Sequence, residues 1–122
     1  MTLNEIANEL VEGCRSNTAV ANLDRLYAPD CRSVEAQDFG GGREVQGLEA
    51  IKGKHNYWES TFEFLGGSIS DPFPNGDNQF AVIFEVQTKH RETGEIADMK
   101  EVALYTVDGG KIVKEEFLYP PE

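Results

Sequence analysis

The feature that most constrains this chain is a pair of apolar runs in residues 100–119, which are joined by Asp108, Gly109 and Gly110. Asp-Gly and Gly-Gly are strong signals for a tight β-hairpin turn, because both central residues of such a turn adopt positive φ. A two-residue loop would turn one mostly apolar face toward the core. That face contains Val102, Leu104, Thr106, Val113, Glu115, Phe117 and Tyr119, and the opposite face contains Glu101, Ala103, Tyr105, Ile112, Lys114 and Glu116.

Glu115 is the one charged residue on the predicted core face of this hairpin. A buried carboxylate requires a hydrogen-bonding partner, a shifted pKa or a cavity that holds water. The rest of the chain is therefore expected to build a pocket over the hairpin or to leave the edge of the hairpin open.

The charge of the chain narrows the classes of partner. With 22 acidic and 11 basic residues, the net charge is −11, which disfavours binding to nucleic acid or to an anionic membrane. No apolar run approaches the ~20 residues of a membrane span, and the first residues lack the pattern of a signal peptide. We therefore expect a single domain over residues 1–122 in the cytoplasm. Cys14 and Cys31 indicate neither a disulfide framework nor a metal site, and we expect no cofactor.

The predicted elements are helices first and strands afterwards. Thr2 and Glu5 form a capping box that starts a helix with one apolar stripe, and a short second helix follows Thr18. This order indicates an α+β fold, in which three helices pack on one face of a curved antiparallel sheet. The open end between helices and sheet is a natural place for a cavity. The remaining predicted elements are a strand over 30–37, a loop over 39–42, a helix over 47–60, and strands over 62–70, 79–89 and the closing hairpin.

His55 interrupts an apolar stripe on the third predicted helix. Leu48, Ile51, His55, Trp58 and Phe62 are spaced by three or four residues and so share one helix face. Two interpretations of His55 stay open. It is either a core histidine bound to a backbone carbonyl, or a pocket acid/base, since imidazole titrates near neutral pH. Trp58 is expected to be largely buried.

The strand over residues 79–89 alternates between a core face and an outer face. Phe80, Val82, Phe84 and Val86 are expected to face the core. The outer face would then carry more apolar area than a free surface normally does, and we predict a homodimer through this face. Its apolar residues would be Ala81, Ile83, Ala103, Tyr105 and Ile112.

The order of elements and three short segments resemble the NTF2-like superfamily and, within it, the SnoaL-like domains. The segments are residues 26–30 (LYAPD), 47–51 (GLEAI) and 108–113 (DGGKIV). The resemblance covers nearly the whole chain and implies a cone-shaped, curved antiparallel sheet packed against three N-terminal helices. It does not specify one function, because this fold hosts isomerases, cyclases, dehydratases, hydrolases and non-catalytic binding or assembly domains.

Ketosteroid isomerase is a more distant relative in this superfamily, and its site residues can be carried over by position. The resemblance places its general-base aspartate at Glu35 and the pocket tyrosine of its third helix at His55. Its two oxyanion-hole donors fall on Val11 and Val102, which have no side-chain donor. Loss of even one such donor costs ~100-fold or more in rate, so the ketosteroid isomerase mechanism is not expected here.

Two hypotheses about function follow. The first is a cofactor-free isomerase, cyclase or dehydratase that acts on a small, mostly apolar molecule by acid/base chemistry. Its catalytic residues would be Glu35, His55 and Glu115, with Glu35 taking a proton from carbon. The ligand would contact Tyr27, Trp58, Phe84, Leu104, Phe117 and Tyr119.

The second hypothesis is a binding or assembly module that performs no chemistry. The missing oxyanion donors favour it. Convergence of Glu35, His55 and Glu115 around one cavity would favour the enzyme. Each unpaired polar group in a dry core costs about 1–3 kcal/mol, so a wet functional pocket explains three inward polar side chains better than core packing does.

Overall fold

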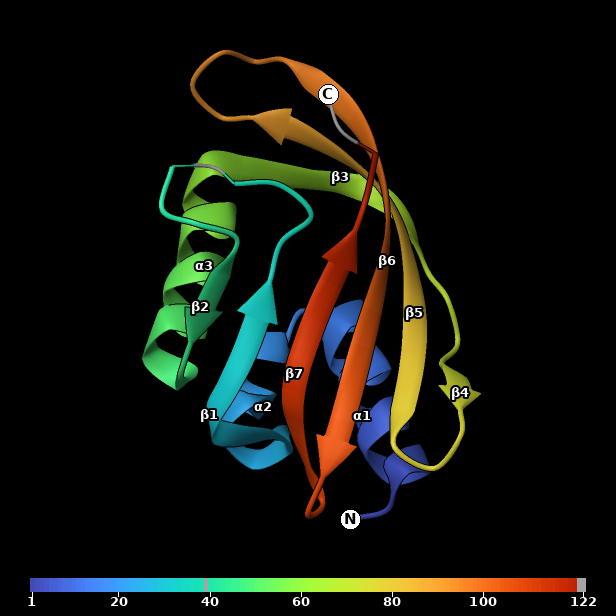
Figure 1. The fold of residues 1–122 in the computed structure, drawn as a ribbon. Helices are drawn as coiled ribbons and strands as arrows, with labels where there is room; N and C mark the ends of the chain where they lie inside the picture. The colour runs from blue at the N-terminus through green and yellow to red at the C-terminus, as the bar shows by residue number, and fades with distance from the viewer. Residues whose placement is uncertain (39, 121–122) are drawn as a thin grey trace.

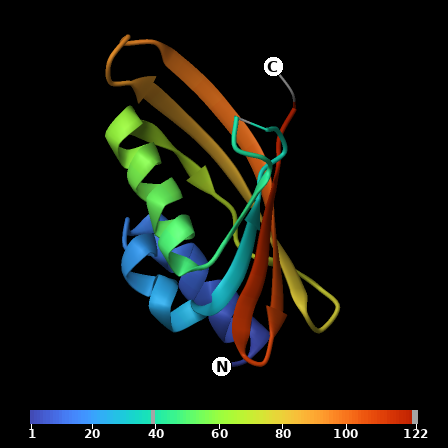
Figure 2. The ribbon, with the colours of Figure 1, turned by 60° about the vertical axis from the view of Figure 1, so that its left-hand side comes forward.

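The computed structural model describes residues 1–38 and 40–120, so Phe39 of the predicted loop lies outside the description. The helices are α1 (Leu3–Arg15), α2 (Ala19–Leu26) and α3 (Leu48–Thr61). The strands are β1 (Tyr27–Val34), β2 (Glu44–Gln46), β3 (Phe62–Ile69), β4 (Phe73–Asn75), β5 (Gln79–His90), β6 (Ile96–Asp108) and β7 (Lys111–Leu118). They form one curved sheet in the order β2-β1-β7-β6-β5-β3, with β4 paired to β5 (Figure 1). All three helices lie on the same side of this sheet (Figure 2).

The sheet is mixed, although most of its strand pairs are antiparallel as predicted. β3, β5, β6 and β7 form antiparallel pairs in series, whereas β1 runs parallel to β7. A parallel pair needs a long crossover connection, and residues 35–110 supply it because β1 is the first strand in the sequence and β7 the last. The parallel register places Ser33 directly beside Glu115.

The first helix begins where the sequence predicts it. The Thr2 side chain accepts a hydrogen bond from the Glu5 backbone N–H, and the Glu5 carboxylate accepts one from the Thr2 N–H, which completes the capping box. The buried face of α1 then packs into the core through Ile6, Ala7, Leu10 and Val11. Among the described helices, none is both long and apolar enough to cross a membrane.

A β-bulge in the closing hairpin reverses one of the predicted faces. Val107 pairs with Ile112, but Thr106 already pairs with Lys114, so Val113 is an extra residue in β7. A bulge of this kind shifts the alternation of one strand relative to its partner. The inward side of β7 is as predicted near Glu115, whereas the inward side of β6 is the opposite of the predicted one.

The prediction that Val102, Leu104 and Thr106 face the core is therefore wrong. Ala103 and Tyr105 are buried instead, and they stand opposite Phe117 and Glu115 in the register of β6 and β7.

The correction also changes the predicted dimer face, because Ala103, Tyr105 and Ile112 belong to the core. The outer face carries Ala81 and Ile83 together with Val102, Leu104 and Leu118. A homodimer through this corrected face remains a proposal.

The centre of the core lies between β5, β6 and the first two helices. Phe80 is fully buried, and its ring stacks on Tyr105 with a centroid separation of 4.9 Å. Val82 is also fully buried, and Phe84 packs against the same core. The predicted alternation of β5 is thus confirmed for these three residues.

The second half of α3 stands away from the core. Ile51 is the buried residue of this helix, and Trp58 is 39% exposed, so the prediction that Trp58 is largely buried is wrong. Its ring meets the edge of Phe62 instead. The residues between Ile51 and Trp58 are mostly polar or glycine and offer little apolar area to seat the helix on the sheet. On the inner sheet face, Phe84, Glu101 and Phe117 are only partly buried.

Candidate functional site

Glu115 lies in β7 near the middle of the sheet and is 3% exposed. Its two carboxylate oxygens accept hydrogen bonds from different hydroxyls, the Tyr27 OH at 2.5 Å and the Ser33 Oγ at 2.7 Å. Burial, followed by the charge of Glu115, raises the pKa of Tyr27 well above its usual range, so this hydroxyl stays a donor. The buried carboxylate therefore has the partners that its position requires.

Lys54 of α3 connects this buried group to the accessible side of the sheet. Its Nζ donates to Ser33 Oγ at 2.7 Å and forms an ion pair with Glu35 Oε1 at 2.5 Å. The Tyr119 hydroxyl donates to the other oxygen of Glu35 at 2.9 Å. About a quarter of each ion-paired side chain is exposed, 26% for Lys54 and 24% for Glu35. We call the connected side chains of Glu35, Lys54, Tyr119, Ser33 and Glu115 the Lys54 cluster.

Glu101 lies beside the Lys54 cluster on the inner face of β6, opposite Phe84 of β5. Burial first, and the charges of Glu35 and Glu115 in addition, raise the pKa of Glu101 to about 7 against the opposing effect of Lys54. Within residues 1–38 and 40–120, every fully buried polar side-chain atom has a hydrogen-bond partner. The Glu101 carboxyl makes no side-chain hydrogen bond there, so it keeps contact with solvent.

His55 is the neighbour of Lys54 on α3 and is partly buried. Burial lowers its pKa, the charges of Glu115 and Glu59 oppose that effect, and Lys54 adds to it. A lowered imidazole pKa keeps the ring neutral at pH 7, so it can both donate and accept a hydrogen bond.

The structure brings two of the three predicted catalytic residues into one network. Glu35 and Glu115 are linked through Lys54 and Ser33, and His55 lies close enough to respond to the charge of Glu115. Only Glu35 is accessible among the two carboxylates. Whether any of the three is catalytic stays a prediction.

The predicted ligand-binding residues fall into four groups. Phe117 and Tyr119 belong to the site, since Lys54 Nζ lies 5.2 Å from the Phe117 ring centroid and Tyr119 binds Glu35. Tyr27 lies beneath the site on Glu115. Leu104 is on the other sheet face, opposite Glu116, so its prediction as a pocket residue is not supported by the register. The remaining two are Phe84, opposite Glu101, and Trp58, at the exposed edge.

Sequence reasoning missed Lys54, Ser33 and Glu101. Lys54 could have been found, because it is spaced three residues after Ile51 and four before Trp58 on the same helix face. Nothing in the sequence around Ser33 marks it as a site residue. Its role follows only from the parallel register that pairs it with Glu115. Glu101 was assigned to the outer face because the bulge was not recognised.

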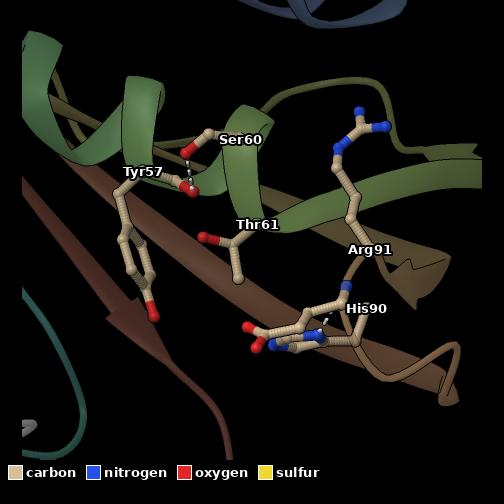
Figure 3. A pocket seen from close by; sticks show the side chains of 6 residues that line it. Tyr57, Ser60, Thr61, His90 and Arg91 are labelled. Carbon is tan, nitrogen blue, oxygen red and sulfur yellow. Dashed lines mark hydrogen bonds between the residues drawn. The ribbon is translucent and has the colours of Figure 1, made fainter.

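Two open hollows lie elsewhere on the surface, with volumes of about 470 and 500 Å³. The smaller lies between the end of α3 and the β5–β6 turn (Figure 3). Its polar groups hold local backbone, since Ser60 Oγ donates to the Tyr57 carbonyl and His90 Nδ1 accepts from the Glu92 N–H. Neither hollow includes a residue of the Lys54 cluster. In the described part of the chain, no three His, Cys, Asp or Glu side chains gather to hold a metal ion.

The stability of the fold should depend on the ionisation of Glu101. Its pKa is raised from 4.5 in the unfolded chain to about 7 in the folded one, so its stabilising contribution is complete below pH 4.5 and is lost as pH rises through 7. We expect the wild type to lose about 2–3 kcal/mol more stability than Glu101→Gln between pH 4 and pH 8. Urea unfolding of both proteins across this range measures the difference. Parallel curves for the two proteins would show that Glu101 ionises normally.

Comparison with known proteins places these features in a wider group. The sequence matches the SnoaL-like domain family over residues 1–119. A Mesorhizobium loti protein, provisionally named a SnoaL-like polyketide cyclase with carbohydrate phosphatase as a second name, is 37% identical with a TM-score of 0.89. The match covers 98% of this chain and 100% of that chain.

More distant structures share the fold. An NTF2-like protein from Burkholderia pseudomallei is 17% identical with a TM-score of 0.78, and the match covers 98% of this chain and 92% of that one. A Bacillus subtilis protein provisionally named an isomerase is 16% identical with the same TM-score, covering 99% and 91%. No curated protein matches by this comparison. The NTF2-like fold with three N-terminal helices, predicted from the sequence, is confirmed.

Proposed function

We propose, on the premise that this chain belongs to the SnoaL-like domain family, that it is a cofactor-independent enzyme of the isomerase or cyclase type. Its substrate would be a small, uncharged and mostly apolar carbonyl compound. The observation that carries the proposal is the partly buried carboxyl of Glu101 on the inner sheet face, beside the Lys54 cluster. The cyclase name of the Mesorhizobium loti protein and the isomerase name of the Bacillus subtilis protein agree with this class.

Glu101 is better suited to proton transfer than Glu35. Lys54 and Tyr119 already hold the two oxygens of Glu35, whereas Glu101 titrates at about 7, close to the pH at which a general base is most effective. The Glu101 carboxylate would take a proton from the carbon next to the carbonyl. The electron pair of the C–H bond forms a C=C bond while the π pair of the carbonyl moves onto its oxygen, which gives an enolate.

The Lys54 cluster would stabilise that enolate. The ammonium of Lys54 has three N–H donors, of which Ser33 and Glu35 engage two, and a preorganised donor lowers the energy of a developing oxyanion. Protonated Glu101 then returns its proton to a second carbon in an isomerisation. In a cyclisation, the enolate carbon instead adds to a second carbonyl carbon of the same substrate. The π bond of that carbonyl breaks, its electron pair moves onto the oxygen, and the oxygen takes the proton from Glu101.

The charges of the site favour an uncharged substrate. Three carboxyl groups, on Glu35, Glu101 and Glu115, surround the single ammonium of Lys54. A substrate with its own negative charge would be repelled. The rings of Phe117 and Phe84 offer apolar contact near the polar groups.

Deuterium exchange tests the proposal without knowledge of the natural substrate. The wild type is incubated in D₂O with a panel of aromatic ketones and 1,3-diketones, and NMR follows the loss of the acidic C–H signal. We expect catalysed exchange of at least one compound, with a rate that rises with pH to a plateau above about 7. Glu101→Gln should reduce this rate by about 100-fold or more. The matched control is Glu116→Gln, whose side chain is opposite Leu104 on the outer face.

Other outcomes would favour other functions. If a panel compound binds near Lys54 but the wild type exchanges no proton, the binding module is favoured. If Glu101→Gln exchanges protons as fast as the wild type, Glu101 is not the base, and the role first predicted for Glu35 becomes the next to test.

A further inference from the structure

We propose that Glu115 is a positioning residue, which acts through the hydroxyl of Ser33 to hold the Lys54 ammonium in place beside Glu35. This inference rests on the proposed function for its catalytic meaning. The geometry that supports it is independent of any substrate. Glu115 itself is 3% exposed and lies behind Ser33, so it does not contact a molecule bound at the accessible side.

The direction of the hydrogen bonds follows from the chemistry of the three groups. A serine hydroxyl has one proton to donate and lone pairs that accept. An ionised carboxylate only accepts and an ammonium only donates, so Ser33 gives its proton to Glu115 at 2.7 Å and accepts from Lys54 Nζ at 2.7 Å. With its proton committed to Glu115, the oxygen of Ser33 presents a lone pair to Lys54.

The fold fixes both ends of this connection. Ser33 and Glu115 are register partners in the parallel β1–β7 pair, so the backbone sets their separation. The Tyr27 hydroxyl binds the second oxygen of Glu115 and thereby fixes the rotation of the carboxylate. Ser33 and Glu115, the buried part of the Lys54 cluster, are consequently rigid. Lys54 is a long side chain with considerable rotamer freedom, and this rigid part gives it a fixed partner.

The consequence for the site is a fixed positive charge. Lys54 is held by Ser33 on one side and by Glu35 on the other, over the ring of Phe117. The same charge acts on Glu101, where it favours the ionised form. Glu115 thus determines, through Ser33, the position of the Lys54 ammonium in the described site.

Two variants that each remove one hydroxyl separate this role from a general structural one. Ser33→Ala and Tyr27→Phe each delete a single donor to Glu115, but only Ser33→Ala breaks the connection to Lys54. Brief labelling of the folded proteins with acetic anhydride, followed by peptide mass spectrometry, measures the reactivity of each lysine. Lys100, whose side chain is 74% exposed, serves as the internal reference.

We expect Lys54 in the wild type to react more slowly than Lys100. Ser33→Ala should raise the relative reactivity of Lys54 by about fivefold or more, because a hydrogen bond to a charged group is lost, whereas Tyr27→Phe should change it less than about twofold. Restoring a hydroxyl with Ser33→Thr should return the reactivity toward the wild-type value. Equal reactivity of Lys54 in both variants, or no change in Ser33→Ala, would overturn the proposal.

A second measurement reports on the site itself. The ¹³C NMR titration of the Glu101 carboxyl should shift in Ser33→Ala, since Lys54 acts on that group, and should stay unchanged in Tyr27→Phe. Both experiments use substrate-free protein, so their results still test the positioning role if the deuterium-exchange experiment finds no catalysis. Conversely, catalysed exchange together with an unaltered Lys54 in Ser33→Ala would reject the positioning role alone.

Discussion

Replacing Glu115 with alanine should lower the free energy of unfolding by about 3 kcal/mol or more, because two buried hydroxyls would lose their acceptor at once. Tyr27 OH and Ser33 Oγ both donate to this carboxylate in the interior of the sheet. Each buried donor without a partner costs about 1–3 kcal/mol, and the space left by the side chain adds a cavity term. The loss is therefore larger than for a typical single substitution.

Chemical denaturation at pH 7 measures this effect, and the neighbouring glutamate provides the control. Glu116 lies on the outer face of the same strand, where it is 3.8 Å from Lys114 in a partly exposed ion pair. Glu116→Ala should change the unfolding free energy by less than about 1 kcal/mol. If the two alanine variants lose similar stability, the hydroxyl contacts of Glu115 do not hold the sheet together.

Phe80→Ala should lower the free energy of unfolding by about 3–5 kcal/mol, the range for large aromatic residues in a core. Phe80 is fully buried and stacks on Tyr105 at an interplanar angle of 18°. Its removal deletes that stack and leaves a cavity between the sheet and the first two helices. Calorimetry or urea unfolding measures the loss.

Phe73 is the matched control for this substitution. It lies in β4, is 57% exposed and pairs with Ala81 of β5, so it belongs to the same part of the sheet. Phe73→Ala should cost less than about 1 kcal/mol. Equal losses for the two phenylalanine variants would mean that the core is not centred where the fold places it.

The sequence predicts most of the architecture because several local signals agree with the global fold. The capping box at Thr2, the alternation around Phe80 and the Gly109-Gly110 turn each specify an element or a face, and each is present in the structure. The short strands β2 and β4 carry three residues each and give too little pattern to be recognised.

The face of β6 could not be predicted by counting residues. One extra residue in β7, Val113, shifts the pairing between Thr106 and Val107, and a shift by one residue moves every side chain of a strand to the other face. No glycine or proline marks the bulge in the sequence. Glu101 therefore changed from an expected surface residue into the central residue of the proposed site.

The candidate site was predicted in part for a similar reason. Glu115 was identified because a carboxylate is unusual on a face that points inward, and Glu35 because the resemblance to ketosteroid isomerase places a general base there. The side chains that connect them, Lys54 and Ser33, have ordinary spacing and ordinary polarity. Their importance follows from the parallel β1–β7 register, which joins residues more than eighty positions apart and has no local signature.

The position of β7 also has a consequence for how the protein is made. β7 is the last of the described strands to be synthesised, yet it lies between β1 and β6 near the middle of the sheet. While the ribosome is still producing residues 111–118, β1 has no partner along one edge, and the helices cover an incomplete layer. Non-local strand pairing of this kind forms slowly, and unpaired edges invite association with other chains. A truncation within β7 would leave the facing edges of both β1 and β6 without a partner, so it should disturb the middle of the sheet and not only its edge.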